Sequence, residues 1–259
     1  MGKLFGYIKQ PVFENWHITR KIGQGIYSEV YEISSGNKTA VIKVKPVFAE
    51  NMSSLKKKIT VAEREAVIMD SLKECPYIVQ YQGKAIQKIS DLKYLFIIKM
   101  EKLKPFTEQE NIFISEENVM KIALDIAKSL ECVHNLGIVH CDVKPDNFFI
   151  SRDGIYKLGD FNISDYQGLE RSISGSHGYT APEVYTCNTY DLRSDIYSYG
   201  ISIKQLMKQK CSPEFAKIIF KACSPDVQTR YQSVNEIISD ISAIKRNNYV
   251  NPADFLVKR

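Results

Sequence analysis

The chain has 259 residues, of which 44% are hydrophobic and 25% are charged, a composition that is typical of a globular protein and excludes a largely disordered one. The formal net charge of +5 is mild, so it suits phosphate-bearing ligands and gives no reason to expect nucleic acid as a partner. No apolar run approaches the roughly 20 residues of a membrane helix. No secretory signal is evident either. We therefore expect a cytoplasmic protein without a membrane span.

The first part of the chain predicts β-hairpins. The segment "KIGQGIYSEVYEI" (21–33) has β-branched and aromatic residues around two glycines, and "KTAVIKV" (38–44) follows the turn-like "SSGN". Strand side chains alternate between faces, which places on one face Val41 and Lys43, and on the other Ala40, Ile42 and Val44. A lysine on the side of a glycine loop could meet a phosphate, although the same loop could be only a tight turn.

Two helices follow from the spacing of apolar residues. The first is predicted over residues 54–73, where apolar residues recur at intervals of three and four. Glu65 lies close to this apolar stripe, and a buried acid needs a partner. The second helix is predicted to begin after Ser115, a residue type that caps helix N-termini, and to end at Gly137.

The polar segment "HCDVKPDN" (140–147) therefore lies in a loop directly after a long buried helix. The next residues, "FFIS", the turn "RDG" and "IYKLGDFN", are predicted to form another hairpin, and the remainder is predicted to be mostly helical.

Six segments in order resemble the motif set of eukaryotic-like serine/threonine protein kinases: "IGQGIYSEVY", "VIK", "HCDVKPDN", "GDFN", "APE" and "RSDIYSYG". The resemblance covers nearly the whole chain. It implies a two-lobed α+β protein-kinase fold, with a small β-rich N-lobe that carries one helix and a larger, mainly α-helical C-lobe. Residues 1–259 would form a single kinase domain, with an N-lobe over about 1–101, a hinge over about 101–104 and a C-lobe over about 105–259.

The resemblance also implies ATP-dependent phosphorylation of serine or threonine hydroxyls on protein substrates, with ATP and Mg²⁺ as cofactors. Such transfer requires that the triphosphate is held, its charge neutralised and the attacking hydroxyl aimed. Lys43 would hold the α- and β-phosphates and pair with Glu65. Asp142 would accept the proton of the substrate hydroxyl, and Lys144 would steady the γ-phosphate. The oxygen ligands of Mg²⁺ would come from Asn147 and Asp160.

The adenine site follows from the same resemblance. Met100 would be the gatekeeper, the backbone of Glu101 and Leu103 would meet the adenine, and Val30 and Val41 would cover the ring. The family usually has alanine in place of Val41, so this covering is bulkier. The full ATP-binding set implied in this way is Ile22, Gly23, Gly25, Val30, Val41, Lys43, Met100, Glu101 and Leu103.

Other motif residues imply supporting roles. Ser176 would frame the acceptor hydroxyl together with Lys144, which favours serine or threonine over tyrosine as the acceptor. The resemblance further implies that Glu183 pairs with Arg230 as a brace and that Asp195 anchors the catalytic loop. His140 is expected to brace Phe161 rather than act as an acid or base, and His134 is expected to be a packing residue.

The chain departs from the family pattern at several positions. Cys141 replaces the arginine that usually precedes the catalytic aspartate and that pairs with an activation-segment phosphate. Cysteine cannot bind a phosphate in that way, so we expect activity that does not depend on phosphorylating Ser172 or Ser174. Ser28 replaces the third loop glycine, and Asn162 replaces the glycine after "DF". The C-lobe is also expected to be compact, because the segment that usually separates the helix beginning near Asp195 from the helix near Arg230 is shortened here.

Three alternative functions stay open on the sequence. A catalytically weak or silent pseudokinase scaffold, which binds nucleotide and partner proteins, is suggested by these departures. A small-molecule phosphotransferase of the antibiotic-kinase type shares the acid–asparagine loop but normally lacks the "APE" segment. A nucleic-acid binder has only the mild basic charge in its favour. The sequence does not indicate the oligomeric state.

Overall fold

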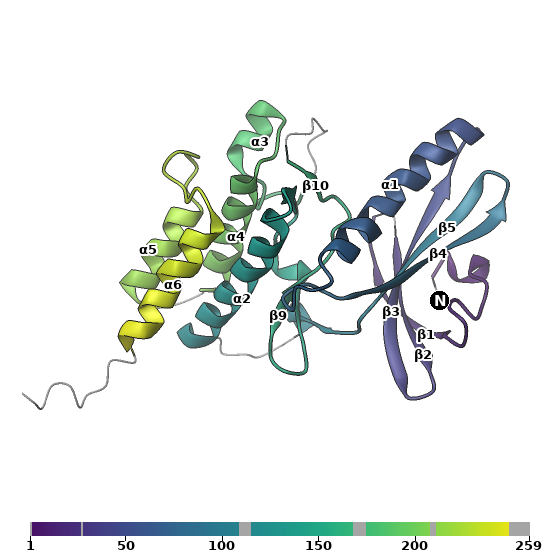
Figure 1. Ribbon diagram of the computed structural model, residues 1–259, viewed down its shortest axis with the longest axis horizontal. Helices are drawn as coiled ribbons and strands as arrows, with labels where there is room; N and C mark the ends of the chain where they lie inside the picture. The colour runs from purple at the N-terminus through teal and green to yellow at the C-terminus, as the bar shows by residue number, and fades with distance from the viewer. Residues whose placement is uncertain (1, 27, 109–114, 168–174, 208–210, 249–259) are drawn as a thin grey trace, which may run out of the picture. The chain divides into compact units, whose positions relative to one another are not determined.

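The computed structural model describes residues 2–26, 28–108, 115–167, 175–207 and 211–248. The chain divides into two compact units, Met1–Lys104 and Pro105–Arg259. The first is built on a β-sheet and the second is mainly helical, so the predicted α+β fold class is confirmed (Figure 1).

The first unit contains one sheet of five antiparallel strands in the order β1-β2-β3-β5-β4. Its strands are β1 (His17–Gln24), β2 (Glu29–Ser35), β3 (Lys38–Phe48), β4 (Tyr81–Ser90) and β5 (Lys93–Met100). The predicted hairpins of β1, β2 and β3 are confirmed. Strand β4 was not predicted, although its half-buried and exposed residues alternate along its whole length.

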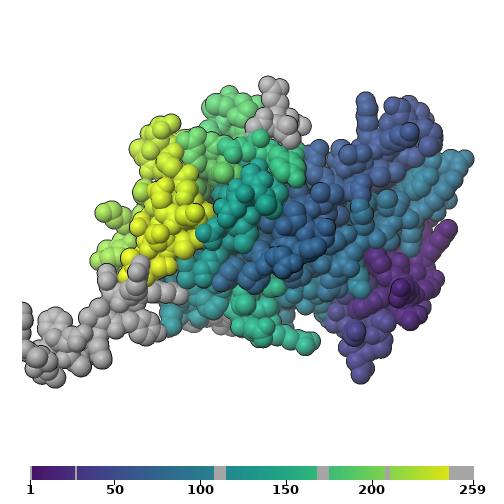
Figure 2. All heavy atoms as spheres, in the orientation of Figure 1, coloured from purple at the N-terminus to yellow at the C-terminus, as the bar shows by residue number. Residues whose placement is uncertain are grey.

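One face of this sheet packs against the segment that precedes it. Ala40, Ile42 and Val44 share a fully buried cluster on this face, as the alternation predicted. Ile8 and Val12 complete the cluster from residues 2–16, a segment that includes the short helix η1 (Phe5–Tyr7). In Figure 2 the purple atoms of the N-terminal residues lie against the sheet. The sequence analysis assigned no role to this segment.

A buried carboxylate fastens the N-terminal segment to β2. Glu29 is 2% exposed, and its two oxygens accept the backbone N–H groups of Lys3 and Leu4, both at 2.9 Å. The hydroxyl of Tyr31 donates to Oε2 of the same carboxylate, and the Nζ of Lys21 donates to Oε1 at 3.0 Å. Burial acts to raise the pKa of Glu29, but the hydrogen bonds together outweigh it and lower the pKa to about 2.

On the other side of β3, helix α1 (Met52–Ser71) packs against β3, β4 and β5. Asn51 caps it and forms a reciprocal capping box with Ser54. Glu65 is buried on this helix, as predicted from its place beside the apolar stripe.

The second unit is organised around helices. After β6 (Lys104–Pro105) and η2 (Phe106–Glu108), its elements are α2 (Glu116–His134), β7 (Ile138–Val139), η3 (Pro145–Asn147), β8 (Phe148–Ile150), β9 (Tyr156–Leu158), β10 (Asp165–Tyr166), α3 (Pro182–Cys187), α4 (Leu192–Leu206), α5 (Pro213–Ala222) and α6 (Val234–Asn248). Ser115 caps α2 by accepting the N–H of Asn118 at 3.3 Å, and β8 pairs with β9, so both predictions are confirmed.

Along the described chain, α5 is the single helix that follows α4 and precedes α6, and it packs against both (Figure 1). Gly200 on α4 permits this close approach, because a Cβ there would lie 2.6 Å from the backbone nitrogen of Cys223. The expectation that the C-lobe is compact relative to the kinases that the chain resembles stays a prediction.

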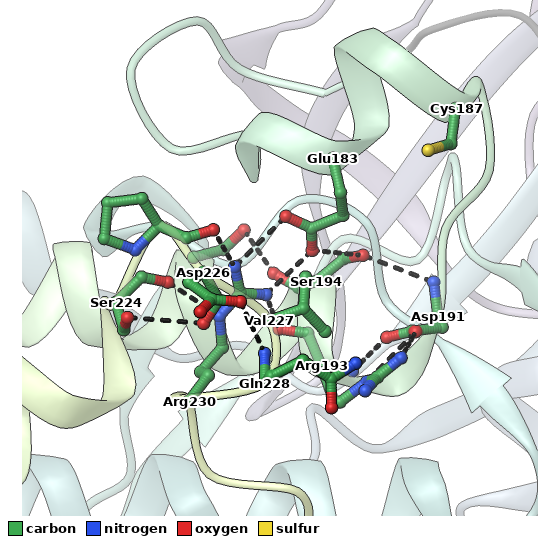
Figure 3. A network of polar contacts seen from close by, with 12 residues as sticks. Glu183, Cys187, Asp191, Arg193, Ser194, Ser224, Asp226, Val227, Gln228 and Arg230 are labelled. Carbon is green, nitrogen blue, oxygen red and sulfur yellow. Dashed lines mark hydrogen bonds and ion pairs between the residues drawn. The ribbon is translucent and has the colours of Figure 1, made fainter.

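An ion pair ties α3 to the loop after α5. The fully buried guanidinium of Arg230 donates to both carboxylate oxygens of Glu183, at 2.7 and 3.1 Å, and to the carbonyls of Arg193 and Ser224 (Figure 3). The predicted brace between Glu183 and Arg230 is confirmed.

In the part of the chain that the structure describes, no helix is both long enough and apolar enough to cross a membrane.

We expect the stability contributed by Glu29 to depend on pH. Since its pKa is lowered on folding, its charge stabilises the fold above the ordinary value of 4.5, and this contribution is lost as pH falls toward 2. The shift corresponds to about 3 kcal/mol. In urea unfolding at several pH values, the stability gap between wild type and Glu29→Gln should be widest above pH 4.5 and should narrow toward pH 2. The exposed control Glu74→Gln should show no such trend, and a Glu29 gap that is constant with pH would contradict the assignment.

Candidate active site

The loop between β1 and β2 brings two glycines together in a tight turn. The N–H of Gly25 donates to the carbonyl of Ser28 at 2.8 Å. A Cβ on Gly25 would lie 2.7 Å from the Oγ of Ser28, so that position has little room for a side chain. Gly23 lies opposite Val30 on β2, where a Cβ would meet the Val30 side chain at 3.3 Å. Both positions therefore suit glycine, the residue type that lets a backbone approach a phosphate closely.

Lys43 on β3 and Glu65 on α1 form a buried ion pair. The Nζ of Lys43 donates to Oε1 of Glu65 at 2.8 Å, and the two side chains are 8% and 1% exposed. The partner that the buried acid was predicted to need is therefore present. Lys45 also ion-pairs with Oε2 of the same carboxylate, a contact that the sequence analysis did not foresee.

The residues expected around adenine lie on neighbouring strands of the same sheet. Val41 on β3 stands opposite Met100 at the end of β5, and Val30 on β2 stands opposite Lys43. Ile22 on β1 is 40% exposed. The register therefore places Val41 directly opposite the expected gatekeeper, while Val30 lies opposite a position two residues further along β3.

Gln80, which sequence reasoning missed, holds the backbone just after β5. The N–H of Glu101 donates to the carbonyl of Gln80 at 3.0 Å, and the N–H of Gln80 donates to the Glu101 carboxylate at 2.8 Å. Because the N–H of Glu101 is used in this way, its carbonyl is the backbone group suited to accept a hydrogen bond from adenine. Leu103, two residues further along, is partly exposed.

In the second unit, the carboxylate of Asp142 is surrounded by donors from the loop 140–147 and from Ser176. Oδ1 accepts the hydroxyl of Ser176 at 2.8 Å. Oδ2 accepts the side-chain amide of Asn147 at 3.1 Å and lies 2.9 Å from the Nζ of Lys144. The same lysine donates to Ser176. A half-buried aspartate with a hydroxyl and an ammonium group on it has the arrangement needed to orient an incoming hydroxyl.

The side chain of Asn147 is oriented with its nitrogen toward Asp142 and its oxygen away from it. Its Nδ2 donates to both the backbone oxygen of Asp142, at 2.8 Å, and the carboxylate, which leaves Oδ1 as the oxygen that could bind a metal. Asp160 has a φ of 61°, which is unusual for a residue other than glycine and is often found at functional sites. The described residues contain no group of three or more His, Cys, Asp or Glu side chains arranged for a metal. Mg²⁺ usually takes only one or two carboxylates from the protein and further oxygens from phosphate. The carboxylate of Asp160 and Oδ1 of Asn147 are ligands of this kind.

His140 braces the segment around Phe161. The two rings lie 4.8 Å apart edge to face, and both residues are fully buried. Nδ1 of His140 accepts the N–H of Asp142 at 3.3 Å, so Nε2 carries the proton that is donated to the carbonyl of Gly159 at 3.1 Å. Burial lowers the pKa of His140 despite the nearby carboxylates. The ring is thus a neutral structural group, as expected.

Asn162, the residue after Phe161, does not adopt a positive φ.

Asp195, in the first turn of α4, holds the beginning of the loop 140–147 through hydrogen bonds to its backbone. It is fully buried and accepts the N–H groups of His140, at 2.7 Å, and Cys141, at 2.9 Å. Nε2 of His134 lies 3.0 Å from the same carboxylate, so this histidine has a hydrogen-bonding role that the sequence analysis did not predict. The predicted anchoring role of Asp195 is confirmed.

A family comparison agrees with this geometry: the family described as protein kinase domain matches residues 16–222. The chain belongs to the protein kinase domain family. Similar curated proteins include a probable serine/threonine-protein kinase of Clostridium perfringens (strain 13 / Type A), 24% identical over 95% of this chain and 40% of the relative. Mitogen-activated protein kinase kinase kinase 17 of Arabidopsis thaliana is 30% identical over 74% of this chain and 51% of its own. The mitosis inhibitor protein kinase SWE1 of Saccharomyces cerevisiae (strain ATCC 204508 / S288c) is 26% identical over 95% of this chain and 32% of the relative. The chain thus spans about half the length of these relatives or less.

The position in the kinase domain where the family usually has arginine is occupied by a packed side chain. Cys141 is 5% exposed and belongs to an apolar cluster with Val139, Ala181, Val184 and Tyr190. Its φ of 69° is another positive value outside glycine, and its thiol forms no disulfide. The side chain therefore contributes packing, and the small buried side chain expected here is observed. Ser172 and Ser174 lie outside the described residues.

We expect Asp195→Asn to destabilise the protein by about 1–3 kcal/mol, because the amide group must face an N–H donor and leave it unsatisfied in the core. Urea unfolding of the variant, compared with the exposed control Asp153→Asn, measures this effect. Equal stability of the two variants would show that the carboxylate does not hold the loop.

Proposed function

We propose that this kinase domain transfers the γ-phosphoryl group of ATP to serine or threonine hydroxyls of protein substrates. The observation that carries the proposal is the environment of Asp142, whose carboxylate receives donors from Lys144, Asn147 and Ser176. A hydroxyl group of serine already donates to this carboxylate at 2.8 Å, which is the interaction that an acceptor hydroxyl requires. The two compact units are proposed to be the two lobes of one kinase domain.

The proposed reaction is a displacement at phosphorus. The substrate oxygen forms a bond to the γ-phosphorus, the bond to the β-γ bridging oxygen breaks, ADP leaves, and the hydroxyl proton passes to Asp142. Lys144 neutralises charge on the γ-phosphoryl group, and Lys43 neutralises charge on the α- and β-phosphates. The glycine loop supplies backbone N–H groups, and the carbonyl of Glu101 and the N–H of Leu103 hold the adenine.

The carboxylate of Asp160 and Oδ1 of Asn147 are the groups proposed to hold Mg²⁺. The ion, when bound, supplies positive charge to the phosphate oxygens. Asn147 is oriented for this by its own hydrogen bonds to Asp142, at 2.8 and 3.1 Å, so its amide cannot easily turn its nitrogen toward the ion.

Serine or threonine is favoured as the acceptor because Ser176 and Lys144 stand beside Asp142. The name of one relative agrees, since the Clostridium perfringens protein is called a probable serine/threonine-protein kinase. A protein substrate is favoured by the "APE" segment, whose Glu183 is braced by Arg230. The cytoplasmic location expected from the sequence stays a prediction, which cell fractionation would test.

Activity without phosphorylation of the activation segment is part of the proposal. The support is Cys141, whose thiol contacts the carbonyl of Val139 at 3.5 Å inside an apolar cluster and brings no positive charge to the loop. Without an arginine at this position, a phosphate on the segment would lack its usual cation there.

We expect Asp142→Asn, Lys43→Met and Asp160→Ala each to lower phosphate transfer at least 100-fold, about 2.7 kcal/mol of barrier, while the protein stays folded. Mass spectrometry of a peptide library incubated with Mg²⁺ and ATP measures transfer, and circular dichroism checks folding. The exposed replacements Asp153→Asn and Lys84→Met serve as controls and should retain activity. A wild type that binds Mg²⁺-ATP but phosphorylates nothing would favour the silent scaffold instead.

The phosphatase-treated double variant Ser172→Ala/Ser174→Ala should phosphorylate an external substrate at nearly the wild-type rate, because Cys141 gives the loop no phosphate-binding cation. Ser176 is left intact, since its contact with Asp142 would confound the assay. A loss of ~100-fold or more, about 2.7 kcal/mol, would show that phosphorylation of this segment switches the enzyme on.

A further inference from the structure

Strand β3 carries a second buried lysine on the face that carries Lys43. Residues two apart on a strand point to the same side, so Lys45 reaches the same carboxylate from the next position along. Its Nζ ion-pairs with Oε2 of Glu65, while Lys43 donates to Oε1 at 2.8 Å. The side chains of Lys43, Lys45 and Glu65 are only 8%, 10% and 1% exposed.

This triad sets two buried lysines against one acid. Burying an ammonium group is costly unless its charge is paired. Oε2 of Glu65 is the one buried side-chain oxygen or nitrogen in the described residues that has no hydrogen bond, so the ion contact with Lys45 is what compensates it.

We propose that Lys45 is a positioning residue for phosphate transfer, acting through Glu65; this rests on the proposed function. When Lys43 turns its ammonium group toward the phosphates of ATP, Glu65 must share that group with the nucleotide. Lys45 holds the second oxygen of Glu65 throughout, so the carboxylate stays in place and keeps Lys43 oriented. It also attaches α1 to β3 at a second point on the same side chain.

A purely structural role for Lys45 predicts a different pattern of effects. It would lower stability without a link to Glu65, and its effect on transfer would add to that of changing Glu65. A residue that acts through Glu65 should instead have no further effect once the carboxylate is gone. The chain supplies a matched control in Lys84, which ion-pairs with Glu63 on the same helix but at the surface, with side chains 39% and 34% exposed.

The test compares Lys45→Met, Lys45→Arg, Glu65→Gln, the double variant Lys45→Met/Glu65→Gln and the control Lys84→Met. We expect Lys45→Met to lower kcat/KM for ATP at least tenfold, Lys45→Arg to recover most of it, and Lys84→Met to stay within twofold of wild type. The double variant should be no worse than Glu65→Gln. A Lys45→Met enzyme within twofold of wild type, or a double variant whose loss is the product of the two single losses, would overturn the proposal.

Two measurements keep the test independent of turnover. Titration with Mg²⁺-ATP should show at least fivefold weaker binding to Lys45→Met, and amide hydrogen exchange of α1 around Glu65 should be faster than in wild type and in Lys84→Met. If wild type binds ATP without transferring phosphate, the proposed function fails, yet these two readouts still decide the role of Lys45. Unchanged binding and exchange would refute it. If Lys45→Met does not fold, Lys45→Gln takes its place in every comparison.

Discussion

The arrangement of the second unit depends on one buried carboxylate, Asp195. It has no exposure to solvent, and it accepts the N–H groups of His140 and Cys141 while His134 lies 3.0 Å from it. It stands in the first turn of α4, where the helix dipole favours negative charge. Two consecutive N–H groups on one carboxylate define the direction in which the loop leaves, and Asp142 follows immediately. The position of the proposed base is therefore set by a group that takes no part in the reaction.

Helix α4 extends this control to other segments through its serines. Ser202 donates to the carbonyl of Val143 at 3.1 Å, Ser198 donates to the carbonyl of Tyr179 at 2.8 Å, and Ser194 donates to Glu183 at 3.3 Å. Each bond satisfies a polar group in or near the core, where an unpaired group would be expensive. A single helix thus sets the catalytic loop, the segment after Ser176 and helix α3, which explains why its sequence is unusually polar for a buried element.

The sequence was enough to predict features that depend on local pattern or motif order. The β1–β3 hairpins, the cap of α2 and the pair of Glu183 and Arg230 belong to this group. It could not predict how Glu29 or Lys45 is used, because the partners of a buried charge come from tertiary contacts with no fixed spacing. Residues 2–16 lack a strong period, so their packing on the sheet gave no signal. Strand β4 alternates in burial but not strictly in polarity, because Ile86 is 46% exposed while Gln87 lies on the half-buried side, so its sequence carried only a weak signal.

The proposal that activity does not need segment phosphorylation rests on how Cys141 is packed. In the usual loop, an arginine and a phosphate join the catalytic loop to the activation segment. Here Cys141 lies in one apolar cluster with Ala181 and Val184, at the C-terminal end of the segment that runs over 160–183. Gly175 also approaches closely, because a Cβ there would lie 3.0 Å from the carbonyl of Cys141, and its φ of 120° suits glycine. Apolar contact and backbone proximity persist without a modification, so Ser176 can remain beside Asp142 in the unphosphorylated chain. This is the physical basis on which constitutive activity is proposed.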